Sequence, residues 1–176
     1  RTRLVPLQDL GEKLNDYEKA TYWNFKASLH YALDDTAGAM AAYKNVLRQK
    51  DVPELMRLNT LYGIAQLAFA TGDYAQSVKV MQKWLTLAPE VKPEAHILIA
   101  QAQYQLKQYA RAEQATLDAL KLARQKSLPP KESWLSLLRA AYYEQKDYLK
   151  SARVLEALVQ RWPKPSYWMQ LAGLYG

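Results

Sequence analysis

Apolar and polar positions follow one another along this chain with the periodicity of amphipathic helices. Apolar and polar residues do not alternate strictly over any stretch, so no β-strand is predicted. The spacing of Leu7, Leu10 and Leu14 predicts a short helix after Pro6. From about Asp16 onwards the pattern is more regular and predicts further helices over residues 16–33, 37–50, 53–71, 74–88, 92–106, 109–127, 131–146, 148–162 and 166–175.

Proline and glycine residues mark the same breaks. Proline is tolerated in the first turn of a helix and prevents a helix from continuing beyond its last turn. Prolines occupy both kinds of position, with Pro53, Pro93 and Pro130 where helices open and Pro89 and Pro163 where they end. Gly72 allows a left-handed residue after a helix. No long linker interrupts the series, so we expect one continuous all-α domain.

A short motif recurs in the breaks between helices. Residues 72–77 (GDYAQS) have near-copies at 108–112 (QYARA) and 146–152 (KDYLKSA), and a weaker copy at 34–39 (DDTAGA). The equivalent residues Thr36, Tyr74, Tyr109 and Tyr148 are separated by 38, 35 and 39 positions. A repeat of this size indicates stacked helical hairpins, an architecture that binds other proteins more often than it catalyses reactions.

The segment 61–89 resembles a tetratricopeptide repeat. The residues that carry the resemblance are Leu61, Ile64, Ala65, Ala68, Gly72, Tyr74, Ser77, Met81 and Pro89. Small residues stand at equivalent places in the other repeats, at Ala27 and Ala100 in the first helices and at Ala39, Ala112 and Ser151 in the second. Small side chains let two helices approach to about 8–10 Å. The departures from the repeat pattern are Lys26, Thr36 and Arg139.

The resemblance implies an all-α, tetratricopeptide-like right-handed superhelix of about four and a half antiparallel helical hairpins. We expect the repeats to cover residues 16–52, 53–91, 92–129 and 130–164, with a partial repeat at 165–176. Because the chain begins at Arg1 rather than Met, we expect it to be a piece of a longer or processed protein.

A narrower resemblance rests on aromatic-rich phrases. They are residues 22–25 (YWNF), 59–62 (NTLY), 134–138 (WLSLL), 154–156 (VLE) and 167–176 (YWMQLAGLYG). From about Tyr22 to Gly176 the chain is similar to the repeat proteins encoded beside bacterial TonB energy-transduction systems. This resemblance implies a periplasmic accessory protein that works with the TonB complex in transport. A cytoplasmic location is the alternative.

The composition and the charge of the chain limit the kinds of partner that we expect it to bind. The 13 tyrosines and 5 tryptophans suit half-buried helix faces and binding grooves, since each has an apolar body and a polar tip. The net charge is +7, and residues 121–176 hold ten basic and four acidic residues. Lysines and arginines on solvated helix faces account for this excess of basic residues. The functional alternative is that the excess attracts an acidic partner. No nucleic-acid-binding motif surrounds Arg124, Lys126 and Lys131, so no nucleic acid partner is predicted.

No catalytic constellation is visible. The chain has no cysteine, its glycines are dispersed, and no apolar run approaches the roughly 20 residues of a membrane span. His30 and His96 are 66 residues apart, and neither has a metal-ligand partner at helical spacing. We interpret Asp34 and Asp35 as turn and helix-capping residues. A protein that is not an enzyme is predicted, with no cofactor and no metal.

The repeat register assigns the function to the inner face of the first helices. The predicted partner-binding residues are Asn24, Tyr31, Asn59, Tyr62, Gln66, Phe69, Gln101, Tyr104 and Tyr143. Tyr31, Phe69, Tyr104 and Tyr143 recur at one position of the repeat. These aromatic side chains either pack between helices or stack on a partner peptide, whose backbone the amides would bind.

The sequence predicts two alternative functions. The first is a protein–protein interaction scaffold that holds a partner peptide or protein in its groove. The second is a structural or oligomerisation segment, because Trp168, Leu171 and Tyr175 belong to a repeat without its second helix and could mediate self-association.

Overall fold

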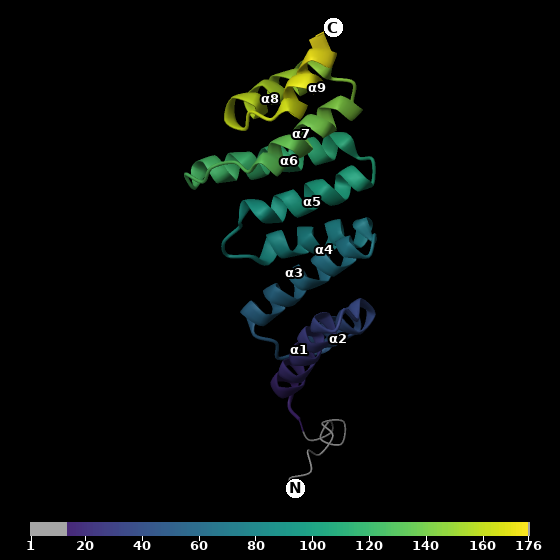
Figure 1. Ribbon diagram of the computed structural model, residues 1–176. Helices are drawn as coiled ribbons and strands as arrows, with labels where there is room; N and C mark the ends of the chain where they lie inside the picture. The colour runs from purple at the N-terminus through teal and green to yellow at the C-terminus, as the bar shows by residue number, and fades with distance from the viewer. Residues whose placement is uncertain (1–13, 176) are drawn as a thin grey trace. The chain divides into compact units, whose positions relative to one another are not determined.

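The structure is a computed structural model that describes residues 14–175, and every regular element in that range is an α-helix (Figure 1). The helices are α1 (Asp16–Ala32), α2 (Thr36–Arg48), α3 (Glu54–Ala70), α4 (Tyr74–Leu87), α5 (Pro93–Gln105), α6 (Tyr109–Gln125), α7 (Glu132–Glu144), α8 (Tyr148–Arg161) and α9 (Pro165–Tyr175). Each matches a predicted helix to within about two residues at either end, the usual uncertainty of helix ends. The short helix predicted after Pro6 lies outside the described residues.

The chain divides into two compact units. Unit 1 ends at Asp73 and contains α1, α2 and α3, and unit 2 begins at Tyr74 and contains α4 to α9. In unit 1, α2 packs against both α1 and α3. In unit 2 each helix packs against the next one along the chain, and α5 also contacts α7. These neighbour contacts are those of helical hairpins stacked in sequence order, as predicted.

Small side chains lie at the helix crossings. Seven alanine and serine residues predicted for these positions are all 0% exposed: Ala27, Ala39, Ala65, Ser77, Ala100, Ala112 and Ser151. A helix surface with so little side-chain volume allows close approach of its neighbour, and the larger residues on either side fill the groove. In unit 2 one such cluster joins three helices, because Ile97 of α5, Ala119 and Ala123 of α6 and Trp134 of α7 pack together.

The first hairpin turn is built from capping interactions. An Asn15–Glu18 capping box opens α1, and the carboxylate of Asp35 accepts a hydrogen bond from the Gly38 backbone N–H at 2.8 Å to cap α2. The other oxygen of Asp35 lies 2.7 Å from Nδ1 of His30. A Cβ on residue 38 would lie 2.3 Å from these same Asp35 and His30 atoms, so a larger residue there would force the Asp35 and His30 side chains to shift. The predicted capping role of Asp35 is confirmed.

The recurring motif marks a left-handed residue at the end of a helix. Asp34, Gly72, Lys107 and Lys146 have φ values of 56°, 81°, 58° and 62°, and each stands two residues before the equivalent Thr or Tyr. At the ends of α1, α5 and α7 two backbone N–H groups bond back to the helix, as Lys107 does to Tyr104 and Gln108 to Gln103, both at 2.9 Å. This is the Schellman arrangement, which satisfies the last carbonyl groups of a helix. The left-handed residue predicted at Gly72 is confirmed, and the same conformation recurs at residues that are not glycine.

Replacing Lys107 by glycine should raise the free energy of unfolding, because a side chain in the left-handed region costs about 1 kcal/mol or more that glycine avoids. The matched control is Lys121→Gly, an exposed position inside α6. There glycine should lower the free energy of unfolding by about 1 kcal/mol. Urea unfolding followed by circular dichroism measures both changes. A loss of stability in the Lys107→Gly variant would contradict the assigned turn geometry.

Candidate functional site

The first helices of the repeats in unit 2 are tied together at their N-terminal ends. Glu94 in the first turn of α5 pairs with Lys131, the residue that precedes α7, at 2.7 Å. Glu132 in the first turn of α7 pairs in the same way with Lys164, which precedes α9, at 2.6 Å. The Lys partners hold the pKa of Glu94 and of Glu132 below the usual range of a carboxyl. Exposed ion pairs contribute little stability, and these two join successive first helices at equivalent places.

The predicted aromatic residues of unit 2 pack inside their own hairpins. Tyr104 makes an edge-to-face contact with Tyr109, with ring centroids 5.3 Å apart, and Tyr143 contacts Tyr148 in the same way at 5.4 Å. In each pair the second tyrosine is the recurring turn residue of the motif. The Tyr104 hydroxyl also donates to Glu144 of the next repeat at 3.5 Å. Burial, followed by the Glu144 charge, raises the pKa of Tyr104.

A pocket of about 270 Å³ lies between α7 and α9. Its lining residues are Arg139, Tyr143, Gln170, Gly173 and Leu174. We call it the α7/α9 pocket. It combines a guanidinium, an amide, a phenol and an apolar side chain, and Gly173 leaves room for close approach of a ligand backbone. Such a set can bind carboxylate or peptide carbonyl oxygens while an apolar group packs beside them.

Three predicted binding residues lie in unit 2. Gln101 is exposed on α5, Tyr104 is half-buried, and Tyr143 is 48% exposed. The structure brings Tyr143 into the α7/α9 pocket. Tyr104 lies close enough to Arg139 for the guanidinium charge to act on its pKa. The aromatic residues therefore pack within the protein and still leave one edge of Tyr143 available to a partner.

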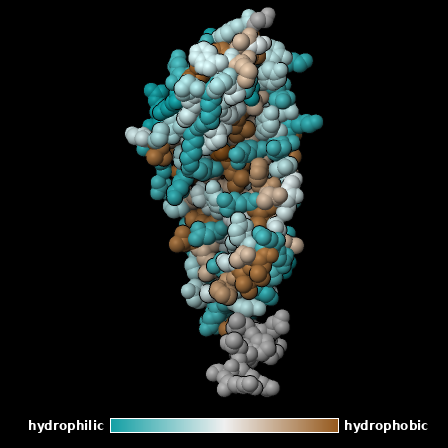
Figure 2. Space-filling view, in the orientation of Figure 1, coloured by the Kyte–Doolittle hydropathy of each residue, from teal (hydrophilic) through white to brown (hydrophobic). Residues whose placement is uncertain are grey.

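The other six predicted residues lie in unit 1. On α1, Asn24 is half-buried and Tyr31 is 64% exposed. On α3, Asn59 and Gln66 are exposed, whereas Tyr62 and Phe69 are half-buried. Figure 2 shows apolar surface over the α1–α2 hairpin.

Sequence reasoning missed three residues of the α7/α9 pocket and misjudged a fourth. Gln170, Gly173 and Leu174 were assigned only to an unfinished repeat, and Arg139 was noted only as a departure from the small residue expected at its position. For two of these four residues, the position within the repeat indicated that they lie near Tyr143 or its neighbours. Arg139 stands four residues before Tyr143 and so shares its helix face. Gly173 follows Ala140, the residue after Arg139 on α7, by 33 residues, close to the repeat spacing.

The departure at Lys26 also has a structural explanation. Its ammonium lies 5.7 Å from the centre of the Tyr22 ring and 5.2 Å from that of Trp23. Cation–π attraction thus replaces the apolar packing that the repeat pattern led us to expect there.

The surroundings of both histidines suit a structural role. His30 pairs with Asp35 at the first turn, and burial lowers the pKa of half-buried His96.

Among residues 14–175 no group of three or more His, Asp or Glu side chains is placed to hold a metal ion. Over the same range, no helix has the length and apolar character needed to cross a lipid bilayer.

Comparisons with known proteins agree with the fold. Residues 62–127 match the family model described as tetratricopeptide repeat. No curated protein sequence matches the chain significantly. Among solved structures, MamA aligns with a TM-score of 0.75 and 18% identity over 90% of this chain and 81% of its own. MamA 41-end from Desulfovibrio magneticus RS-1 aligns with a TM-score of 0.72 and 20% identity over 89% of this chain and 84% of its own.

A third solved structure is that of YrrB, described as a TPR protein with an unusual peptide-binding site. It aligns with a TM-score of 0.71 and 14% identity over 96% of this chain and 80% of its own. Residues 62–127 therefore carry tetratricopeptide repeats, and the chain has the all-helical, repeat-type fold of these solved proteins.

Proposed function

We propose that this chain is a non-catalytic protein–protein interaction module that binds an extended peptide segment of a partner on its first helices. The observation that carries the proposal is the α7/α9 pocket, where Arg139, Tyr143 and Gln170 converge on one hollow. The tetratricopeptide-repeat match and the peptide-binding site named for YrrB support it.

The chemistry of the pocket suits an extended peptide. Main-chain carbonyl groups need donors, which the Arg139 guanidinium and the Gln170 amide supply. Tyr143 is held by Tyr148 and offers a rigid aromatic edge at little cost in side-chain entropy. Gln101 of α5 is exposed and belongs to the same proposal as a further backbone contact. For unit 1 by itself, we propose the exposed amides of Asn59 and Gln66 on α3 as contacts for a peptide backbone.

Peptides selected from a displayed random library against the wild-type chain should bind the Tyr143→Ala and Arg139→Gln variants about tenfold or more weakly, because anchors of this kind commonly contribute more than about 1.4 kcal/mol. Isothermal titration calorimetry measures the affinities. Leu149→Ala is the control, since Leu149 is 62% exposed on α8 and lies outside the pocket. Equal affinities for all three variants and the wild type would reject the α7/α9 pocket as the binding site.

We further propose that the partner belongs to a TonB energy-transduction system and that the protein works in the periplasm. The support is the aromatic-rich phrases at residues 22–25, 134–138 and 167–176. In a co-purification from a Gram-negative cell envelope, TonB-complex proteins should be recovered with the tagged chain and lost with Tyr143→Ala. Recovery of a cytosolic set of proteins with no TonB-complex member would discard this placement.

A second candidate function is self-association through α9. None of its residues is buried, and Trp168 and Met169 are 55% and 68% exposed. If this function holds, sedimentation velocity should show a larger species as concentration rises, and Met169→Asp should abolish it. Leu149→Asp on α8 is the control. A single monomeric species at all concentrations would exclude self-association.

A further inference from the structure

A second hollow lies at the connection between α6 and α7, away from the proposed peptide site. Its volume is about 530 Å³, and its apolar lining includes Leu120, Ala123, Leu128 and Pro130. It shares no lining residue with the α7/α9 pocket. We call it the loop pocket. The loop pocket includes Pro130, just before the first residue of α7, whereas Tyr143 of the α7/α9 pocket lies near the last residue of α7. Pro130 and Tyr143 are therefore about 20 Å apart along the helix.

The local backbone keeps the loop pocket open. Ser127 is left-handed with φ 55°, and the Leu128 N–H bonds back to the Ala123 carbonyl at 2.8 Å, which ends α6. Pro129 and Pro130 follow, and each has a fixed φ and no N–H donor. The chain therefore leaves the helix in a stiff, extended form, and the side chain of Leu128 remains 47% exposed.

The charges around the loop pocket fall into two groups. Lys126 is paired with Glu90 at 2.6 Å, and Lys131 with Glu94 at 2.7 Å, so these two lysines are neutralised locally. Arg124 and Arg161, which line the pocket, have no carboxylate within ion-pair distance among residues 14–175.

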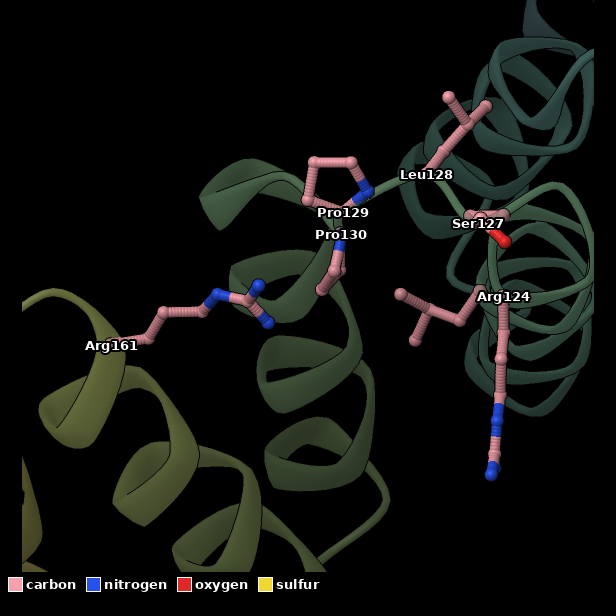
Figure 3. A pocket seen from close by; sticks show the side chains of 8 residues that line it. Arg124, Ser127, Leu128, Pro129, Pro130 and Arg161 are labelled. Atoms are coloured by element: carbon pink, nitrogen blue, oxygen red, sulfur yellow. The ribbon is translucent and has the colours of Figure 1, made fainter.

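The two arginines that line the loop pocket belong to different helices. Figure 3 shows Arg161 extending from α8 toward Pro130, whereas Arg124 lies on α6 on the other side of the prolines and its guanidinium is directed away from them. Two guanidinium groups without an ion pair among residues 14–175 thus lie on either side of an apolar floor, and that of Arg161 also lies 5.7 Å from the centre of the Trp162 ring. A guanidinium binds a carboxylate through two parallel hydrogen bonds, and the apolar floor suits an aliphatic side chain.

We propose that the loop pocket binds an acidic segment of a partner protein, in which an aliphatic side chain lies between carboxylates. The basic excess of residues 121–176 favours an acidic ligand over a neutral one. A lipid surface fits less well, because polybasic membrane sites use clusters of roughly four to eight cations. Here the pairing of Lys126 and Lys131 leaves Arg124, Arg161 and nearby Lys121.

The test uses fluorescence anisotropy with a short labelled peptide that has a leucine between two pairs of glutamates. The wild-type chain should bind it, and binding should weaken as salt rises. The double variant Arg124→Glu/Arg161→Glu should lose about tenfold or more in affinity. The control Lys79→Glu/Lys83→Glu makes the same change in net charge on exposed positions of α4 and should bind like the wild type.

A second comparison tests the apolar floor. A peptide with serine in place of the leucine should bind the wild type several-fold more weakly, and Leu128→Ser should remove this discrimination. In the Tyr143→Ala background, Arg124→Glu/Arg161→Glu should still weaken the binding of the leucine peptide, which distinguishes this site from the α7/α9 pocket. Circular dichroism shows that each variant keeps its helical content.

Three results would overturn the proposal. One is the absence of peptide binding to the wild type, and another is an equal loss in the arginine and lysine double variants. The third is arginine-dependent binding of phosphatidylserine vesicles without binding of the peptide, which would identify a lipid surface instead. Failure of the peptide-library experiment at Tyr143 would leave this site unaffected.

Discussion

The close approach of neighbouring helices is the constraint on which this structure depends. It is possible because small residues lie between packed helices, and no surface remains exposed at Ala39, Ala100, Ala112 or Ser151. The same holds at Ala119 and Ala123, where a larger side chain would push the helices apart and uncover Ile97 and Trp134, which pack with them. Since each hairpin is buried only against its neighbours, the placement of every later helix within a unit depends on these contacts.

Because of the turn geometry and the ion pairs, the packed helices present a surface that repeats along the chain. Left-handed residues follow α1, α5 and α7, where two backbone N–H groups bond back to the preceding helix in the same way. At the opposite ends, Glu94 and Glu132 are held by Lys131 and Lys164, which stand just before the next first helix. As a result, equivalent positions of α5 and α7 recur on one face, which is the requirement for a peptide to meet similar groups along its length.

The two pockets of unit 2 differ in what they offer a ligand. The α7/α9 pocket contains one guanidinium among uncharged polar and aromatic groups, which suits a peptide backbone. The loop pocket contains two guanidiniums over an apolar floor, which suits alternating acidic and aliphatic side chains. A partner that engaged both would gain from the effective concentration that the first contact creates for the second.

Local features of the sequence determined the helices, their breaks and the small residues at the crossings, because capping, proline and side-chain size act over a few positions. The aromatic recurrence at Tyr104 and Tyr143 was also visible, but its role was not. Only the tertiary structure paired these rings with Tyr109 and Tyr148 and set Tyr104 beside Glu144, forty residues away. Likewise, only the folded chain distinguished neutralised Lys126 from unpaired Arg124 and placed Arg139 opposite Gln170. The exposure and charge environment of a side chain depend on residues far away in sequence, whose distance and orientation are fixed only when the repeats stack.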